Sequence, residues 1–162
     1  MDREFTYLND VITPEVAVRL SMVGLDQTLS LFYWKGFIGK DDEEAFGLFE
    51  SLGGNMAPEF KAGDRRLKEW MAEGFDPETE EGSFFAAYST AQMLQVADGG
   101  IHLFEETEVG FKVPGIERNF RYYEMAEAAA EFVYQQITEE ELPITLANQR
   151  LRIYSDDYVV MD

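Results

Sequence analysis

The sequence predicts an α+β fold in a single acidic globular domain over residues 1–162, with helices mainly in the first two thirds of the chain. Three observations support this prediction. The chain is 46% hydrophobic and 14% aromatic, which is enough apolar material for one core at a length of 162 residues. Apolar residues recur at helical spacing in several segments. After Pro143, short runs of β-forming residues alternate with turn formers, and this pattern predicts a short antiparallel C-terminal sheet.

The first helix is predicted from its start signals. Thr13-Pro14-Glu15 combines a hydroxyl N-cap, a proline at the first helical position and an acid in the first turn. The helix would end at Gly24. It would bury Val16, Ala17 and Leu20. Residues 4–8 are predicted as a short strand, and residues 28–34 fit either a strand or a helix, because periodicity does not separate the two in a short apolar run.

Two more helices are predicted in the middle of the chain. One would follow the acids at 41–44 and end at Gly53-Gly54. Its apolar residues fall at i, i+3, i+4 and i+7, on one helical face: Ala45, Leu48, Phe49 and Leu52. The other would begin at Asp64 and end at Gly74. It would place Leu67, Trp70 and Met71 on one side.

The remaining elements follow from turn signals and periodicity. Residues 75–82 are predicted as an exposed acidic loop, and residues 83–98 as a helix. A hairpin is predicted near residues 101–113. A long, alanine-rich helix is predicted near residues 117–137. The C-terminal sheet would consist of three short strands at 144–146, 151–154 and 158–161.

The residues that ordinary catalytic motifs require are scarce. There is no cysteine, so disulfides and thiolate metal sites are excluded. The single histidine, His102, lies in a predicted strand and is interpreted as structural or solvent-facing rather than as a catalytic base. Glu59-Phe60-Lys61 matches half of a metal-nuclease motif, but so acidic a chain would repel nucleic acid. Neither a calcium-binding EF-hand loop nor a phosphate-binding loop is found. We therefore predict a protein that is not an enzyme and has no cofactor or metal.

The sequence also bears on location. No apolar run is long enough for a membrane-spanning helix. Residues 1–4 lack the basic region and apolar run of a signal peptide. With no cysteine in the chain, these observations favour the cytoplasm.

The strongest functional signal is the charge. Asp and Glu number 32 against 13 Lys and Arg, a formal net charge of −19, and the acids occur along the whole chain. Such a protein repels nucleic acid and anionic membranes, and it attracts basic proteins. The alternative interpretation is that the charge serves only solubility.

Two acid clusters are the candidate partner-binding residues. They are Asp41, Asp42, Glu43 and Glu44, and Asp76, Glu78, Glu80 and Glu81. A third group, at residues 139–141, fits a solvated helix end. Aromatic residues near the acids would anchor a partner while the carboxylates pair with its Arg and Lys side chains. Those expected at the surface are Tyr33, Trp34, Phe75 and Tyr158.

The function predicted from these features is that of an inhibitor which binds a basic, nucleic-acid-handling protein such as a nuclease. It could act by nucleic-acid mimicry, as anti-defence proteins of phages and mobile elements do. Two alternatives stay open. One is an immunity protein that neutralises a basic toxin. The other is a soluble housekeeping or ligand-binding domain whose charge serves only solubility.

Overall fold

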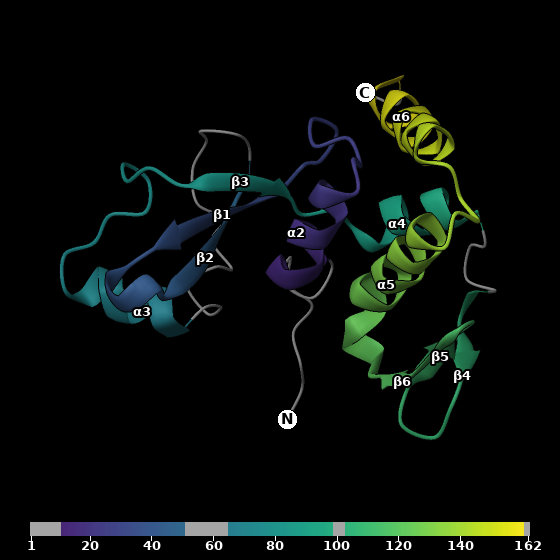
Figure 1. Cartoon of the computed structure of the whole chain (residues 1–162), viewed down its shortest axis with the longest axis horizontal. Coiled ribbons are helices and arrows are strands. Elements are labelled where there is room, and N and C mark those ends of the chain that lie inside the picture. Colours follow the sequence, from purple (N-terminus) through teal and green to yellow (C-terminus); the bar gives the residue numbers. More distant parts are fainter. Residues whose placement is uncertain (1–10, 51–64, 99–102, 161–162) are drawn as a thin grey trace.

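The computed structural model describes residues 11–50, 65–98 and 103–160. Over these residues the predicted α+β class is confirmed by five α-helices and two antiparallel sheets of three strands each. Figure 1 shows the two sheets at opposite ends of the molecule, with helix α2 (Pro14–Met22) between them. The predicted strand at residues 4–8 lies outside the described residues.

The first sheet is ordered β2-β1-β3, with β1 (Tyr33–Ile38) at its centre. Its neighbours are β2 (Glu44–Phe49) and β3 (Ser83–Ala86), both antiparallel to β1. Phe37, on one face of β1, contacts Phe75, which follows helix α3 (Arg65–Ala72). The side chains that alternate with Phe37 along β1 point to the other face of the sheet, which lies beside α2.

The second sheet is ordered β4-β5-β6: β4 is Glu105–Glu106, β5 is Phe111–Val113 and β6 is Ile116–Phe120. It packs against helix α5 (Met125–Thr138), and the other two helices at this end of the molecule are α4 (Thr90–Ala97) and α6 (Ile144–Val160). α4 packs against both α5 and α6. The contact face of α5 is largely alanine, and small side chains let helices approach closely. Its buried residues are Ala126, Ala128, Ala129, Ala130 and Val133.

Several predicted elements are confirmed. α2 follows Thr13 in an extended conformation, begins on Pro14 and buries Val16, Ala17 and Leu20, but the predicted hydroxyl cap is wrong, because the Thr13 side chain makes no capping hydrogen bond. α3 lies within the predicted helix, although Asp64 is outside the described residues. The residues at 76–82 form a turn-rich loop whose acids are exposed. The predicted hairpin is found as β4 and β5, while residues 101–102, including His102, are not described.

The helix predicted after the first acid cluster is wrong, because Glu44–Phe49 is strand β2. Ala45, Leu48 and Phe49 are all buried, on both faces of the sheet. A strand covered on both faces has no simple alternation, so its apolar residues matched a helical spacing. The ambiguous segment 28–34 leads into β1, and Tyr33 and Trp34 are buried rather than exposed.

The helix predicted over residues 83–98 is wrong in its first part, which forms β3. The helix α4 begins only after Ser89, whose hydroxyl accepts a hydrogen bond from the backbone N–H of Gln92 at 3.2 Å. The Gln92 side chain in turn accepts from the Ser89 backbone N–H at 3.0 Å. This reciprocal capping box, Ser-x-x-Gln, is the local signal that marks the true start of the helix.

The long helix begins later than predicted. Residues 116–120 form β6, which pairs with β5 across the turn at Pro114-Gly115, and α5 starts at Met125. Gly115 has a φ of 80°, a backbone conformation that glycine adopts without strain. The turn therefore continues the sheet where the alanine-rich pattern suggested a helix.

The predicted C-terminal sheet is wrong, because residues 144–160 form one helix, α6. Ile144, Ala147 and Leu151 fall at helical spacing, and the last two are fully buried. Their packing against α4 overrides the β-propensity of the neighbouring Ile, Tyr and Val residues. The described part of the chain contains no helix that is long and apolar enough to cross a membrane.

Asn148 of α6 connects that helix to the loop between α2 and β1. Its side-chain oxygen accepts from the backbone N–H of Asp26 at 2.7 Å, and its amide donates to the Gly24 carbonyl at 3.1 Å. Because Asn148→Ala leaves both backbone groups without these partners, we expect it to lower the free energy of unfolding by about 1–2 kcal/mol. Urea denaturation measures this, with the exposed neighbour Gln149→Ala as control. Equal losses in the two variants would contradict this role.

Candidate partner-binding groove

The structure places the two predicted acid clusters at the same end of the molecule. Asp41, Asp42 and Glu43 are exposed in the connection from β1 to β2, and Glu44 is exposed at the first position of β2. Asp76, Glu78, Glu80 and Glu81 are exposed in the loop from α3 to β3. In Figure 1 both connections lie at the outer end of the first sheet, beside α3.

The tip of the β1–β2 hairpin is tightly folded. Asp41 and Asp42 have φ values of 59° and 58°, in the left-handed region that Asp tolerates better than most residues. The backbone N–H of Gly39 donates to the Glu43 carbonyl at 2.8 Å and closes the loop. The acids at 41–43 therefore project from a short, well-defined turn.

Aromatic packing joins this hairpin to α3. The Trp70 ring lies so close to Gly39 that a Cβ there would come within 2.5 Å of it. Trp70 also contacts Phe75 edge-on, with ring centroids 5.5 Å apart, and Phe75 contacts Phe37 in the same way at 5.1 Å. Glycine at position 39 is what lets the indole lie against the end of β1.

A groove of about 530 Å³ runs between the hairpin tip and α3. It combines four carboxylates with two aromatic side chains, and no cationic residue is among the described residues that line it. The lining residues are Gly39, Asp41, Glu43, Glu69, Trp70, Glu73 and Phe75. We call this surface the carboxylate groove.

The carboxylate groove includes two acids that the sequence analysis did not select, Glu69 and Glu73. In the sequence they look like the solvated side of a short helix. The packing of α3 on the hairpin, including the contact of Trp70 with Gly39, brings them opposite Asp41 and Glu43. Their spacing of four residues around Trp70 was the available signal.

The charges of α3 oppose its helix dipole. The helix begins on Arg65-Arg66, whereas Glu69 and Glu73 are near its C-terminal end. The stable arrangement is the reverse, acids at the start and bases at the end. Glu69 and Glu73 also repel each other at a spacing of four residues. Residues that lower the stability of their own helix in this way are expected at functional surfaces.

The second predicted cluster adjoins the groove rather than lining it. Asp76 follows Phe75, and its carboxylate accepts from the backbone N–H of Glu78 at 3.0 Å, so this acid shapes the turn. Beneath the loop, Lys35 is only 6% exposed and donates from Nζ to the Pro77 carbonyl at 3.1 Å. The ammonium also lies 5.2–5.4 Å from the centroids of three rings: Phe37, Phe49 and Phe84.

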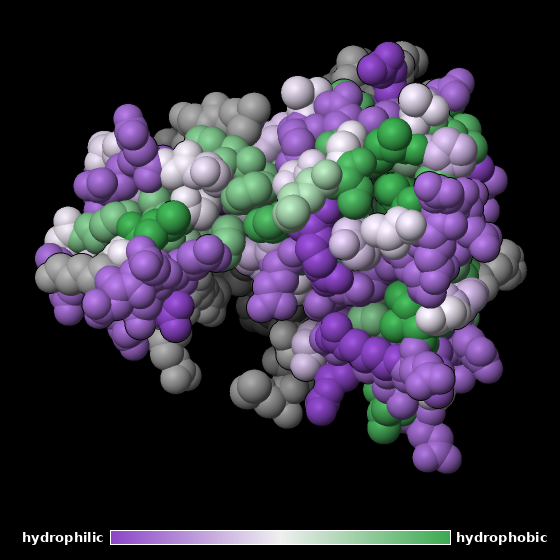
Figure 2. Space-filling view, viewed as in Figure 1, coloured by the Kyte–Doolittle hydropathy of each residue, from purple (hydrophilic) through white to green (hydrophobic). Residues whose placement is uncertain are grey.

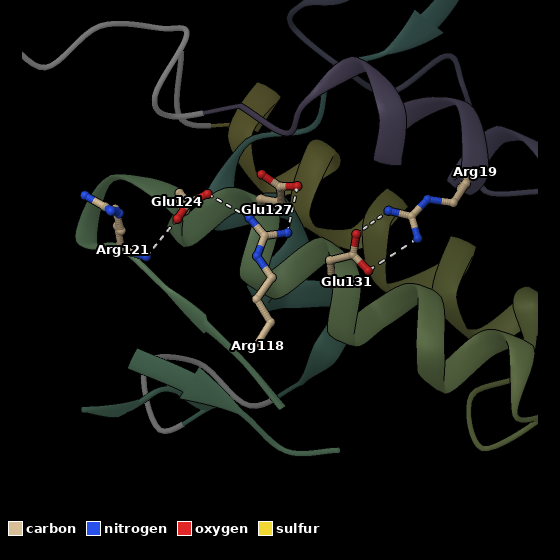
Figure 3. A network of polar contacts seen from close by, with 6 residues as sticks. All are labelled: Arg19, Arg118, Arg121, Glu124, Glu127 and Glu131. Atoms are coloured by element: carbon tan, nitrogen blue, oxygen red, sulfur yellow. Dashed lines mark hydrogen bonds and ion pairs between the residues drawn. The ribbon is translucent and has the colours of Figure 1, made fainter. Parts of the chain in front are cut away.

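Three acids on or next to α5 have arginine partners. Figure 3 shows these acids: Glu124, the residue before α5, and Glu127 and Glu131 within that helix. Arg118 of β6 lies 2.8 Å from Glu124 and 3.4 Å from Glu127, and Arg19 of α2 pairs with Glu131. These ion pairs join α5 to the second sheet and to α2.

The carboxylate groove differs from this network. Within the residues that the structure describes, Asp41, Glu69 and Glu73 form no ion pair. Glu43 lies 4.0 Å from Arg66, and both side chains are about half exposed, so this contact is weak. The groove therefore retains a strongly negative potential.

Glu127 has a second feature, because burial raises the pKa of its carboxyl while Arg118 acts in the opposite direction. A raised pKa means that the folded state binds this proton more tightly than the unfolded state does. Stability from this group is therefore present at low pH and falls as pH rises from the ordinary glutamate pKa through the pKa in the folded state.

Glu127→Gln should flatten the stability–pH curve over that interval. Urea denaturation at several pH values tests this, with the exposed Glu117→Gln as control. Parallel curves for Glu127→Gln and wild type would contradict it.

The chemistry available in the described residues is limited. No group of three or more His, Cys, Asp or Glu side chains there is arranged to hold a metal ion. Comparison with protein-family models, curated proteins and solved structures finds no match for this chain.

Proposed function

We propose that this protein is a non-enzymatic inhibitor that binds a basic, nucleic-acid-handling protein through the carboxylate groove. The observation that carries the proposal is the composition of the groove: four carboxylates around two aromatic rings, with no lining cation in the described residues. A partner would place Arg or Lys side chains in it.

Electrostatics would guide the first encounter. With a net charge of −19, the protein attracts a basic surface over a distance of about 10 Å at 0.1 M salt. Within the groove, Asp41, Glu69 and Glu73 have no cation of their own to exchange, so they can pair with the partner's cations directly. This predicts fast, salt-sensitive association.

The aromatic residues would provide the anchor. Trp70 is partly buried by Gly39 and Phe75 and is held in place by both contacts. An arginine that enters the groove could stack on the indole while its guanidinium pairs with a neighbouring carboxylate. Because the ring is already ordered, little side-chain entropy is lost on binding.

A row of carboxylates also suits nucleic-acid mimicry, because a surface that binds phosphates is built to accept anions. In this interpretation the groove occupies the site that DNA or RNA would use on the partner. Competition with nucleic acid follows directly and separates mimicry from inhibition at another site.

The test is affinity capture from a lysate of the source cells, with two variants that lose the same charge. The groove variant carries Asp41→Asn, Glu43→Gln, Glu69→Gln and Glu73→Gln. The control variant neutralises four exposed acids elsewhere: Glu105→Gln, Glu108→Gln, Glu117→Gln and Glu141→Gln.

Wild type and control should retain a basic, nucleic-acid-binding protein that the groove variant loses. With that partner purified, DNA should compete for binding, and groove neutralisation should weaken affinity at least about tenfold. Equal behaviour of the two variants would refute the proposal.

A further inference from the structure

A small apolar socket opens on the other face of the first sheet. It has a volume of about 140 Å³. Its walls include Val18 of α2, Phe46 of β2 and Phe85 of β3, and Gly36 and Ser83 line it where β1 and β3 are paired. The socket exists because two small residues lie beside large ones in the same register.

Gly36 is the residue that keeps the socket open. It pairs with Phe46 on one side and Ser83 on the other. A Cβ at position 36 would come within 2.8 Å of the Phe46 ring, so any other residue would displace that ring. The socket is continued at the surface by Ile38, which is 74% exposed at the end of the same strand.

The socket adjoins a second hollow of about 530 Å³, with which it shares Glu44 and Phe46. That hollow extends from β2 to α2 and α5 and also contains Glu15, Glu127 and Arg66. Arg66 is already engaged there, since it donates to the Glu44 carbonyl at 2.9 Å. Figure 2 shows a surface that is mostly hydrophilic, with apolar patches over the first sheet and also at the other end of the molecule.

We infer that this socket receives one apolar side chain of a basic partner segment, with the flanking Arg or Lys residues paired to the carboxylates of the adjoining hollow. Two observations determine this occupant. A volume of about 140 Å³ suits a single Leu, Met or Phe side chain, since a cavity of similar size holds a benzene molecule. Glu44 at its edge, with Glu15 in the adjoining hollow, favours cations beside that anchor.

This inference rests on the proposed function for the identity of the partner, but not on the carboxylate groove. Glu43 and Glu44 are adjacent in the chain, and one faces the groove while the other faces the socket. A partner that encloses the hairpin tip would therefore reach both surfaces. Binding energy would be concentrated in the apolar anchor, as in other interfaces with a small central hot spot.

The test uses the full chain and a defined probe, the peptide Gly-Lys-Arg-Leu-Arg-Lys-Gly, followed by NMR of the backbone amides. The expected result is saturable shifts at residues 36, 83 and 85. A peptide with Ala in place of Leu should bind at least about fivefold more weakly. A peptide with Ser in place of every Arg and Lys should also bind more weakly.

Two variants at one position provide the control. Ser83→Phe would fill the socket from its edge and should abolish the shifts at residues 36 and 85, whereas Ser83→Thr should retain them. The inference would be overturned if the amide shifts were the same with the Leu and the Ala peptide, or if they persisted in Ser83→Phe. Concentration-dependent shifts at these amides without peptide would also overturn it, and would identify a second copy of the chain as the occupant.

The outcomes for the socket and the groove can be told apart. If Ser83→Phe leaves partner affinity intact while groove neutralisation abolishes it, only the socket inference fails. If Ser83→Phe abolishes partner affinity while groove neutralisation leaves it intact, the socket inference stands and the assignment of the groove fails.

Discussion

Glu73→Lys is expected to weaken partner binding at least about 100-fold while making the protein more stable. Glu73 lines the carboxylate groove, so the substitution places a lysine opposite the partner's cations. Like charges that face each other across an interface reduce the binding free energy by several kcal/mol. In the isolated protein the same change removes repulsion with Glu69 and places a base at the C-terminal end of α3. These two effects should add about 0.5–1.5 kcal/mol to the free energy of unfolding.

The opposite signs make this result informative. Loss of binding in a more stable protein cannot come from unfolding. Urea denaturation gives the stability, and titration calorimetry with the partner gives the affinity at two salt concentrations. Glu117→Lys changes the charge equally at an exposed position of β6 and should have little effect on binding. If Glu73→Lys and Glu117→Lys weaken binding alike, overall charge matters and the groove does not.

Gly110→Ala is expected to lower the free energy of unfolding by about 3 kcal/mol. Gly110 is buried where β4 leads into β5, and a Cβ there would overlap the carbonyl oxygen of Phe120 in β6. Because the obstacle is backbone, a rotamer change cannot relieve the overlap, and the sheet must shift. The stacked rings of Phe111 and Phe120 would shift with it.

Urea denaturation and circular dichroism measure this effect, with the adjacent Val109→Ala as control. Val109 is 63% exposed, so its truncation should change the free energy of unfolding by no more than about 0.5 kcal/mol. A loss below about 1 kcal/mol for Gly110→Ala would show that β5 and β6 can separate without disturbing the core. Partner binding by the folded fraction should be unchanged, since the second sheet is not part of the carboxylate groove.

Elements with local signals were predictable from the sequence. Pro14 at the first position of α2 and Gly74 after α3 mark helix ends through backbone geometry alone. β2 and α6 were not predictable in this way. Their residues acquire a pattern only from tertiary packing: β2 is covered on both faces, and α6 packs a face of small and apolar residues on α4.

The candidate site was predictable to a similar extent. A run of four acids at 41–44 is visible in the sequence, and three of its members line the groove or the socket. Glu69 and Glu73 could not be found, because their importance depends on the contact between Trp70 and Gly39, residues that are far apart in the chain. A run of acids can be recognised in a sequence, but the residues that lie beside it in the folded protein cannot.

The arrangement of the two tryptophans has a practical consequence. Trp34 is buried, and its indole N–H donates to the Ile12 carbonyl at 2.7 Å, so its emission should be insensitive to anything that binds. Trp70 lies in the carboxylate groove beside Glu69 and Glu73. The chain thus contains one fluorophore shielded from solvent and one at the proposed interface. A change in intrinsic fluorescence when the groove is occupied, absent in Trp70→Phe, would report binding in solution without any label.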